Sequence, residues 1–142
     1  MAWILDKFKK NKLQVEKVCI SREINRYNRF GYGFAVLALK ISDSVSFGLN
    51  QLLPGKTISF HIIEKKRRRI LRKNLRSYDR LIKSIHRKYY IILPNTDETK
   101  VEPVIQRINK IARIYNWGDV SVSVAVCPRD GEDPQALLNK LS

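Results

Sequence analysis

The sequence has few of the residues from which metal and disulfide frameworks are built. Its 142 residues include two cysteines, Cys19 and Cys127, and neither has a second cysteine or a histidine at the spacing of a zinc site. We therefore expect no zinc site. Both cysteines are expected to be ordinary buried thiols in a reducing compartment.

Long apolar runs are also absent. No stretch approaches the roughly 20 apolar residues that cross a bilayer, and the N-terminus lacks an apolar core followed by a small-residue cleavage site. The simplest location is the cytoplasm. With 44% hydrophobic residues, the chain is long enough to bury one core and too short for two independent domains.

Acidic residues are scarce relative to basic ones. The 13 Asp and Glu residues stand against 28 Lys and Arg residues, which gives a formal net charge of +15. Such an excess favours partners that carry phosphates: nucleic acid, a nucleotide or an anionic membrane surface. Charge alone does not choose among them.

Hydrophobic periodicity predicts the order helix, strand, helix, hairpin, helix, strand, helix. The predicted elements are an irregular amphipathic helix over 1–29, a buried strand at 34–41, a long helix over 58–75 with a cationic outer face, hairpin strands near 80–84 and 89–93, an amphipathic helix over 101–115 that starts after a turn and cap at 94–97, a strand at 120–126 and a short helix at 134–141. Residues 43–57 are predicted to form a loop with one helical turn at most. The order predicts an α/β (α+β) sandwich, in which helices cover a mixed, ferredoxin-like sheet of four or five strands.

The N-terminal segment allows three interpretations. We favour a helix that packs on the domain or on a second copy of the chain, and we divide the sequence into an N-terminal signalling or dimerisation segment, 1–21, and a domain, 22–142. A lysine-rich amphipathic helix could instead lie on the inner face of a membrane, which would make the protein peripheral to it. A nucleic-acid-binding arm is the third interpretation.

The stretch from Arg76 to Pro94, RSYDRLIKSIHRKYYIILP, carries the strongest motif. An Arg-x-x-Asp pair, Arg76 and Asp79, precedes two apolar segments on either side of a polar tip. Position for position and without a gap, this stretch resembles the part of GGDEF domains (diguanylate cyclases) that runs from an Arg-x-x-Asp pair through the signature hairpin to a Leu-Pro. Further along, Gln106-Arg-Ile108 is similar to the Glu-Arg-Ile of the next helix. The resemblance covers residues 22–141, is weakest over 42–64, and implies a GGDEF/nucleotidyl-cyclase-like sheet with a signature hairpin.

The positions at which this sequence departs from the family are those of the family's catalytic site. In GGDEF cyclases, two signature glycines admit the guanine nucleotide, and signature acids act with a first-strand aspartate to hold two divalent metals. Here the corresponding positions carry other residues: Lys40, Ile85, His86, Arg87 and Lys88. Because two-metal phosphoryl transfer needs carboxylate oxygens, we expect no cyclase activity, no catalytic residue and no metal.

The resemblance retains a different site. In the family, the Arg-x-x-Asp pair forms a product-binding inhibitory site (I-site), helped by an arginine on the following helix, and Arg76, Asp79 and Arg107 occupy those positions. A guanidinium offers paired donors to phosphate or to the guanine O6/N7 edge, and a carboxylate accepts from guanine N1 and N2. The resemblance therefore implies a non-catalytic receptor for cyclic di-GMP that signals to a protein partner or a second copy.

Two other functions stay open. The domain could be a catalytically dead relic that serves only as a protein-interaction or dimerisation module, with Arg76 and Asp79 as a surface ion pair worth under about 1 kcal/mol. It could also be a basic nucleic-acid-binding module that uses the cationic run of residues 65–73. A run of this kind is more often a solvated helix face.

Overall fold

We describe the protein from a computed structural model. It describes the backbone of residues 2–41, 57–84 and 88–142, and the side chains of 15–41, 62–84 and 88–142. The predicted order of elements is confirmed. They are α1 (Ala2–Phe30), β1 (Phe34–Ile41), α3 (Thr57–Lys73), β2 (Arg80–Lys83), β3 (Lys88–Pro94), α4 (Glu98–Ile114), β4 (Val120–Cys127) and α5 (Pro134–Leu141). The loop predicted at 43–57 lies outside the described residues except at Thr57, where α3 begins.

The described strands form one four-stranded sheet in the order β2-β3-β1-β4. Every neighbouring pair is antiparallel, so the prediction of a mixed sheet was wrong in this respect. The reason is topological. The crossovers through α3 and α4 each join parallel strands, but another strand lies between the members of each pair, as in a split βαβ arrangement.

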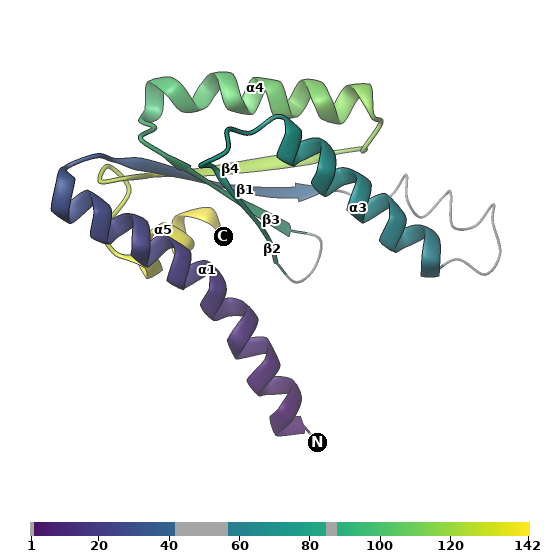
Figure 1. The fold of residues 1–142 in the computed structure, drawn as a ribbon, viewed down its shortest axis with the longest axis horizontal. Helices are drawn as coiled ribbons and strands as arrows, with labels where there is room; N and C mark the ends of the chain where they lie inside the picture. The colour runs from purple at the N-terminus through teal and green to yellow at the C-terminus, as the bar shows by residue number, and fades with distance from the viewer. Residues whose placement is uncertain (1, 42–56, 85–87) are drawn as a thin grey trace.

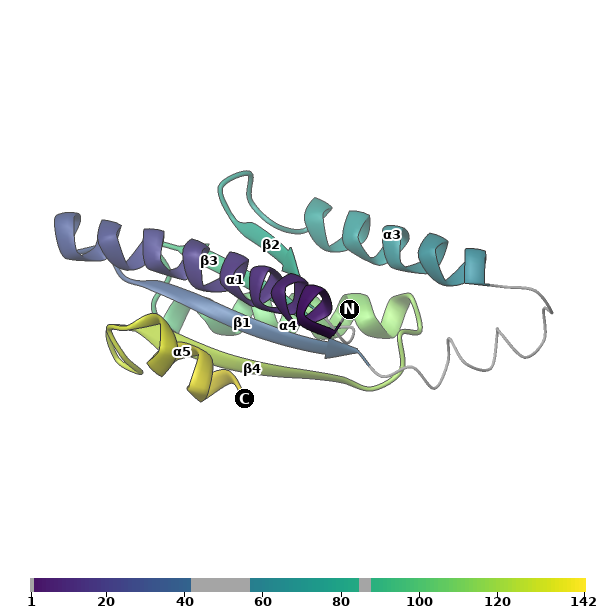
Figure 2. The same ribbon diagram turned by 90° about the horizontal axis from the view of Figure 1, so that it is seen from below.

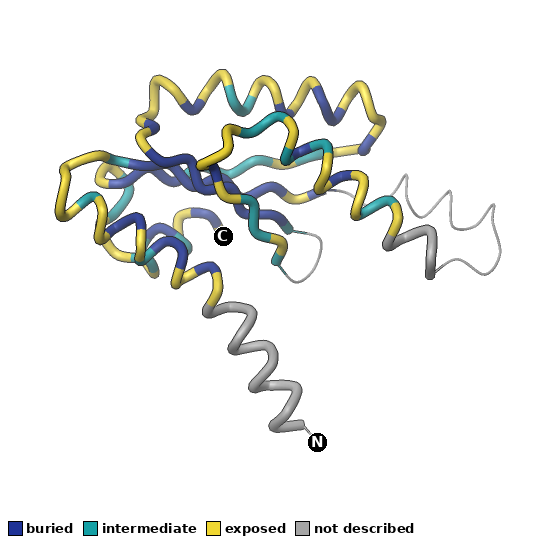
Figure 3. Tube along the Cα trace, viewed as in Figure 1, coloured by how far each residue is buried: buried dark blue, intermediate teal, exposed yellow. Residues whose placement is uncertain are grey.

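The central strand β1 explains why both sheet faces are covered. Its sequence FAVLALKI is apolar on both faces, and seven of its eight residues are buried. The side chains of such a continuous apolar run are all buried only when helices cover both faces of the sheet. Figures 1 and 2 show α3 and α4 on one face and α1 and α5 on the other. Figure 3 shows the buried residues concentrated along the middle of the sheet.

Two apolar clusters hold these layers together. On one face, Leu37 and Ile91 pack with Leu71 of α3 and Ile108 of α4. On the other face, alternate residues of the same strands pack with α1 and α5: Val36, Ala38, Ile92, Ala125, Ile20, Ile24 and Leu137. The alternation follows from the two-residue period of a strand.

The N-terminal helix is continuous through the proposed boundary at residue 21. Its second half packs on the sheet through Cys19, Ile20 and Ile24, as the favoured interpretation predicted. Both cysteines are buried and unpaired, which confirms their prediction as buried thiols. No helix in the described residues is both long and apolar enough to cross a membrane.

The start of α4 confirms the predicted cap. The Asp97 side chain accepts hydrogen bonds from the backbone N–H groups of Thr99 and Lys100, at 2.9 and 3.1 Å. These bonds satisfy donors that the helix itself leaves unpaired. Because β3 ends at Pro94, the cap fixes where α4 leaves the sheet and therefore where Arg107 lies.

Candidate functional site

The Arg-x-x-Asp pair lies on the short turn between α3 and β2. The Asp79 carboxylate folds back on the turn, where its Oδ2 accepts from the Arg76 backbone N–H at 2.8 Å and from Arg76 Nε at 3.3 Å. The Asp79 N–H donates to the Arg76 carbonyl at 3.0 Å. The Asp79 side chain is only 3% exposed, whereas that of Arg76 is 45% exposed. The two residues therefore hold the turn closed by hydrogen bonds, with the Asp79 side chain buried and the Arg76 side chain at the surface.

Further hydrogen bonds hold the turn in place. Arg76 Nη2 donates to the Thr96 hydroxyl at 3.1 Å, and that hydroxyl donates to the Pro94 carbonyl at 3.0 Å. From α3, Arg72 donates to the Asp79 carbonyl at 2.6 Å and also to the Arg76 carbonyl. The turn is thus tied to the end of β3 and to the last turns of α3, so its geometry is set by the fold.

One atom of this network is unsatisfied. Asp79 Oδ1 is buried and has no hydrogen-bond partner among the described residues. A buried acceptor without a partner costs about 1–3 kcal/mol. The Asp79 carboxylate therefore has one buried acceptor, Oδ1, that no described residue satisfies, while its other oxygen bonds Arg76.

Arg107 reaches the same turn from α4. Its side chain is exposed, and Nη1 donates to the Asn74 carbonyl at 3.2 Å. Asn74 is held in turn by a bond from its Nδ2 to the Ile70 carbonyl at 2.8 Å. All three residues predicted for the site thus gather at one corner, although Arg107 binds the backbone of the turn and Asp79 is buried.

Residues that the sequence analysis did not select complete the corner. Tyr78, which is 54% exposed, lies under the Arg76 guanidinium, with 4.6 Å between Cζ and the ring centroid. An aromatic residue inside a polar turn was a usable signal for Tyr78. The roles of Arg72 and Thr96 had no local signal, because they depend on how α3 and β3 meet the turn.

The signature hairpin presents cations at its described positions. Lys40 of β1 and Lys88 of β3 are Cα partners in the antiparallel register, so both side chains lie on the same face of the sheet. Lys88 Nζ lies 5.2 Å from the centroid of the Tyr90 ring. Ile85, His86 and Arg87 lie outside the described residues. Among the described side chains, no three His, Cys, Asp or Glu residues come together in a group that could hold a metal ion.

An acid from α1 lies near the base of this hairpin. Glu16 is buried, and burial raises its pKa, while a hydrogen bond with Ser84 and the charge of Lys88 act in the opposite direction. A lone carboxylate held by a serine and a lysine is a neutralised polar contact between α1 and the hairpin, and it is not a metal-ligand set.

The cationic face of α3 needs one correction. Arg67 belongs to the basic run but is buried, with its guanidinium carbon 6.0 Å from the Trp117 ring centroid. Burial lowers its pKa. The position is four residues from Leu71, which is why it falls on the packed side of the helix. Its neighbours Lys65, Lys66, Arg68, Arg69 and Lys73 are exposed, as predicted.

Comparison with known proteins places this geometry in a fold. No protein-family model and no curated protein matches the chain. Among solved structures, the GGDEF domain of TpbB (YfiN) from Pseudomonas aeruginosa is similar, with a TM-score of 0.67 and 19% identity over 87% of this chain and 74% of that one. A diguanylate cyclase (DGC) protein from Thermotoga maritima has a TM-score of 0.62 and 15% identity over 94% and 90% of the two chains. The diguanylate cyclase SiaD of P. aeruginosa, solved with its activator SiaC, has a TM-score of 0.59 and 19% identity over 89% of this chain and 53% of SiaD. The chain therefore has the fold of a GGDEF domain.

Proposed function

We propose that this chain is a non-catalytic receptor for cyclic di-GMP, which binds at the corner formed by Arg76, Asp79 and Arg107. The observation that carries the proposal is the buried Asp79 carboxylate, which pairs with a half-exposed arginine and whose Oδ1 has no hydrogen-bond partner in the described part of the chain. Guanine N1 and N2 are donors of the kind that this acceptor needs.

Binding requires one local rearrangement. The Arg76 side chain has to leave the Asp79 carboxylate and the Thr96 hydroxyl and turn toward the ligand, and the ligand then has to reach the buried Asp79 carboxylate. The Arg76 backbone N–H keeps its own bond to Asp79 Oδ2, so the turn does not have to unfold. The ion pair that is lost joins a half-exposed Arg76 to a buried Asp79. A bidentate bond from Arg76 to phosphate or guanine and a new donor to Asp79 from the guanine edge would offset it.

The other groups at the corner suit a compact dianion with two purines. Arg107 and Arg76 supply two guanidinium groups, which are more weakly hydrated than the ammonium group of a lysine. The exposed Tyr78 ring offers a face on which guanine can stack. Asp79 supplies the only carboxylate in the set, and it suits a guanine edge better than an adenine edge, which offers no matching pair of donors.

The absence of catalysis is the second part of the proposal. Two lysines, Lys40 and Lys88, occupy paired positions on neighbouring strands where the resemblance implies carboxylates. Two ammonium groups repel a divalent cation and supply no oxygen ligand. We expect no cyclic di-GMP from GTP with magnesium or manganese, and a time-dependent, protein-dependent product would refute this part.

Calorimetric titration tests binding directly. The protein at near-physiological salt should bind cyclic di-GMP saturably at micromolar concentration or tighter, with GTP and cyclic di-AMP as controls. Arg76→Ala should abolish binding. Arg129→Ala is the matched control, because Arg129 is also half-exposed and also pairs with a neighbouring aspartate, Asp130, at 3.0 Å.

Two results would overturn the receptor proposal. Absence of binding heat at high protein concentration would leave a relic that serves only in protein interaction. An equal loss of affinity in the Arg76 and Arg129 variants would show that the ligand is attracted only by the overall charge of the protein. If the receptor is real, we propose that a protein partner or a second copy reads the bound state. SiaD, which shares the fold, was solved with a protein activator.

A further inference from the structure

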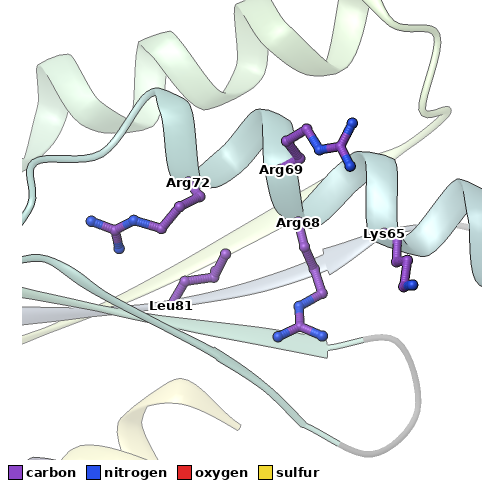
Figure 4. Close-up of a pocket in the computed structure, with 5 residues that line it drawn as sticks. All are labelled: Lys65, Arg68, Arg69, Arg72 and Leu81. Atoms are coloured by element: carbon purple, nitrogen blue, oxygen red, sulfur yellow. The ribbon is translucent and has the colours of Figure 1, made fainter.

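A hollow lined by cations runs along α3 beside the edge strand β2. It has a volume of about 310 Å³ and is lined by Lys65, Arg68, Arg69 and Arg72 of α3 and by Leu81 of β2. In Figure 4, the Arg68 and Arg72 side chains extend past Leu81 at the open edge of the sheet. We call this hollow the cationic groove. None of the described residues that line it is acidic.

The four cations lie along one face of α3. They occupy positions i, i+3, i+4 and i+7, which form one stripe of a helix. Like charges at these spacings destabilise the helix that carries them. Among the described residues, Lys65, Arg68 and Arg69 form no ion pair that would relieve the repulsion.

The cations continue onto the sheet edge. A second hollow, of about 590 Å³, shares Arg68, Arg72 and Leu81 with the groove. It adds Arg80 and Lys83 of β2, and the buried Asp79 also lines it. Lys83 is paired with Glu64, but Arg80 has only the Cys19 sulfur, at 3.8 Å, as a hydrogen-bond acceptor in the described structure. The positive charges thus follow a line along α3 and β2 and do not converge on one point.

We infer that the cationic groove binds the sugar-phosphate backbone of a single nucleic-acid strand. From Lys65 to Arg72 the stripe is about 10 Å long at 1.5 Å per residue, which exceeds what one phosphate can occupy. Three of its four cations are arginines, whose planar forks suit phosphate oxygens. Among the described lining residues Leu81 is the apolar one, and it makes no hydrogen bonds to base edges, so binding should be independent of sequence. The inference does not rest on cyclic di-GMP binding.

Fluorescence anisotropy with a labelled single-stranded oligonucleotide tests the inference. If four phosphates are neutralised, the logarithm of the affinity should fall with the logarithm of salt concentration with a slope of about −2.8, at about 0.7 per phosphate. The triple variant Lys65→Gln, Arg68→Gln and Arg69→Gln should reduce the steepness of that slope by about 2. Arg72 is left intact because it holds the Arg76 turn.

A second triple variant gives a matched control. Lys100, Lys110 and Arg113 are exposed cations of α4, and replacing all three by Gln removes the same charge. This variant should bind the oligonucleotide nearly as tightly as the unmodified protein. Equal losses in the two triple variants would overturn the inference, because overall charge would then explain binding.

Three other outcomes separate the possibilities. No binding at low salt would overturn the inference, and so would tighter binding of poly-glutamate than of the oligonucleotide, which would assign the groove to an acidic protein. Arg76→Ala should leave oligonucleotide binding unchanged. If the unmodified protein binds the oligonucleotide but not cyclic di-GMP, the receptor proposal alone has failed.

Discussion

Asp79 holds the Arg76 turn and, in the proposed function, also contacts the ligand, and two substitutions distinguish these roles. Asp79→Ala removes the acceptor for the Arg76 N–H, a part-buried bond of 2.8 Å, and this loss should cost about 1–2 kcal/mol, as for a lost helix cap. The ion pair with the Arg76 side chain adds little, because that side chain is 45% exposed. Asp79→Asn retains an acceptor of the same shape, so its cost should stay below about 1 kcal/mol.

Thermal unfolding followed by circular dichroism measures the difference. For a chain of this size, 1 kcal/mol corresponds to about 3–5 °C, so Asp79→Ala should lower Tm by about 3–10 °C. Asp79→Asn should leave Tm nearly unchanged and still lose cyclic di-GMP, because an amide presents one acceptor where the guanine edge needs two. The control is Asp119→Ala, which removes an exposed aspartate.

Two results would refute this reasoning. An unchanged Tm in Asp79→Ala would show that the carboxylate does not hold the turn. Unchanged cyclic di-GMP affinity in Asp79→Asn would show that the ligand does not use the carboxylate, and binding would then have to depend on Arg76 and Arg107 alone.

The remaining predictions concern stability and reactivity. Asp97→Ala should destabilise the protein by about 1 kcal/mol in a denaturant titration, because the cap of α4 is lost. Hydrogen bonds from Thr99 lower the pKa of Asp97. The cap's contribution to stability is therefore fully present above the usual pKa of 3.8 and is lost as pH falls through the lowered value. A destabilisation by the substitution that persists unchanged in acid would contradict this. Burial raises the pKa of Glu16, so its ionisation opposes folding as pH rises above 4.5. Glu16→Gln should therefore weaken the fall of the free energy of unfolding with rising pH in that range. A steeper fall in the variant would contradict this. Burial raises the pKa of Cys127 to about 11, so iodoacetamide at pH 8 should label this thiol only after unfolding, and rapid labelling of the native protein would show that it is accessible.

The elements of the fold could be predicted because each has a local signal. The β1 run FAVLALKI is apolar without alternation, which indicates a strand covered on both faces, and Asp97 precedes a helical repeat as a cap does. The prediction of a mixed sheet was wrong because no single segment of the sequence encodes which strands become neighbours. The antiparallel order follows from two crossovers that leave room for β1 between β3 and β4.

The site was harder to predict than the fold, and Asp79 shows why. The motif Arg-x-x-Asp gives the identity of two side chains, but whether the carboxylate faces solvent depends on Arg72 and Thr96, which arrive from other elements. Arg67 is a different case. Its spacing from Ile63 and Leu71 already placed it on the apolar stripe of α3, so its burial could have been predicted from the helical period.

The edge strand β2 separates the two parts of the proposed function, the Arg76 turn at one end and the hairpin at the other. The Arg76 turn enters β2 at Arg80, and the hairpin leaves it after Lys83, so four residues, about 13 Å of strand, separate the two. The turn is held by α3, β3 and its own hydrogen bonds, none of which involves Lys40 or Lys88. In the proposed function, cations at the hairpin stand in place of metal ligands without disturbing the turn, and the cationic groove occupies the stretch between them. An anion bound in the groove would contact Arg72, which donates to the Arg76 carbonyl, so Arg72 is one residue through which the two sites can be coupled.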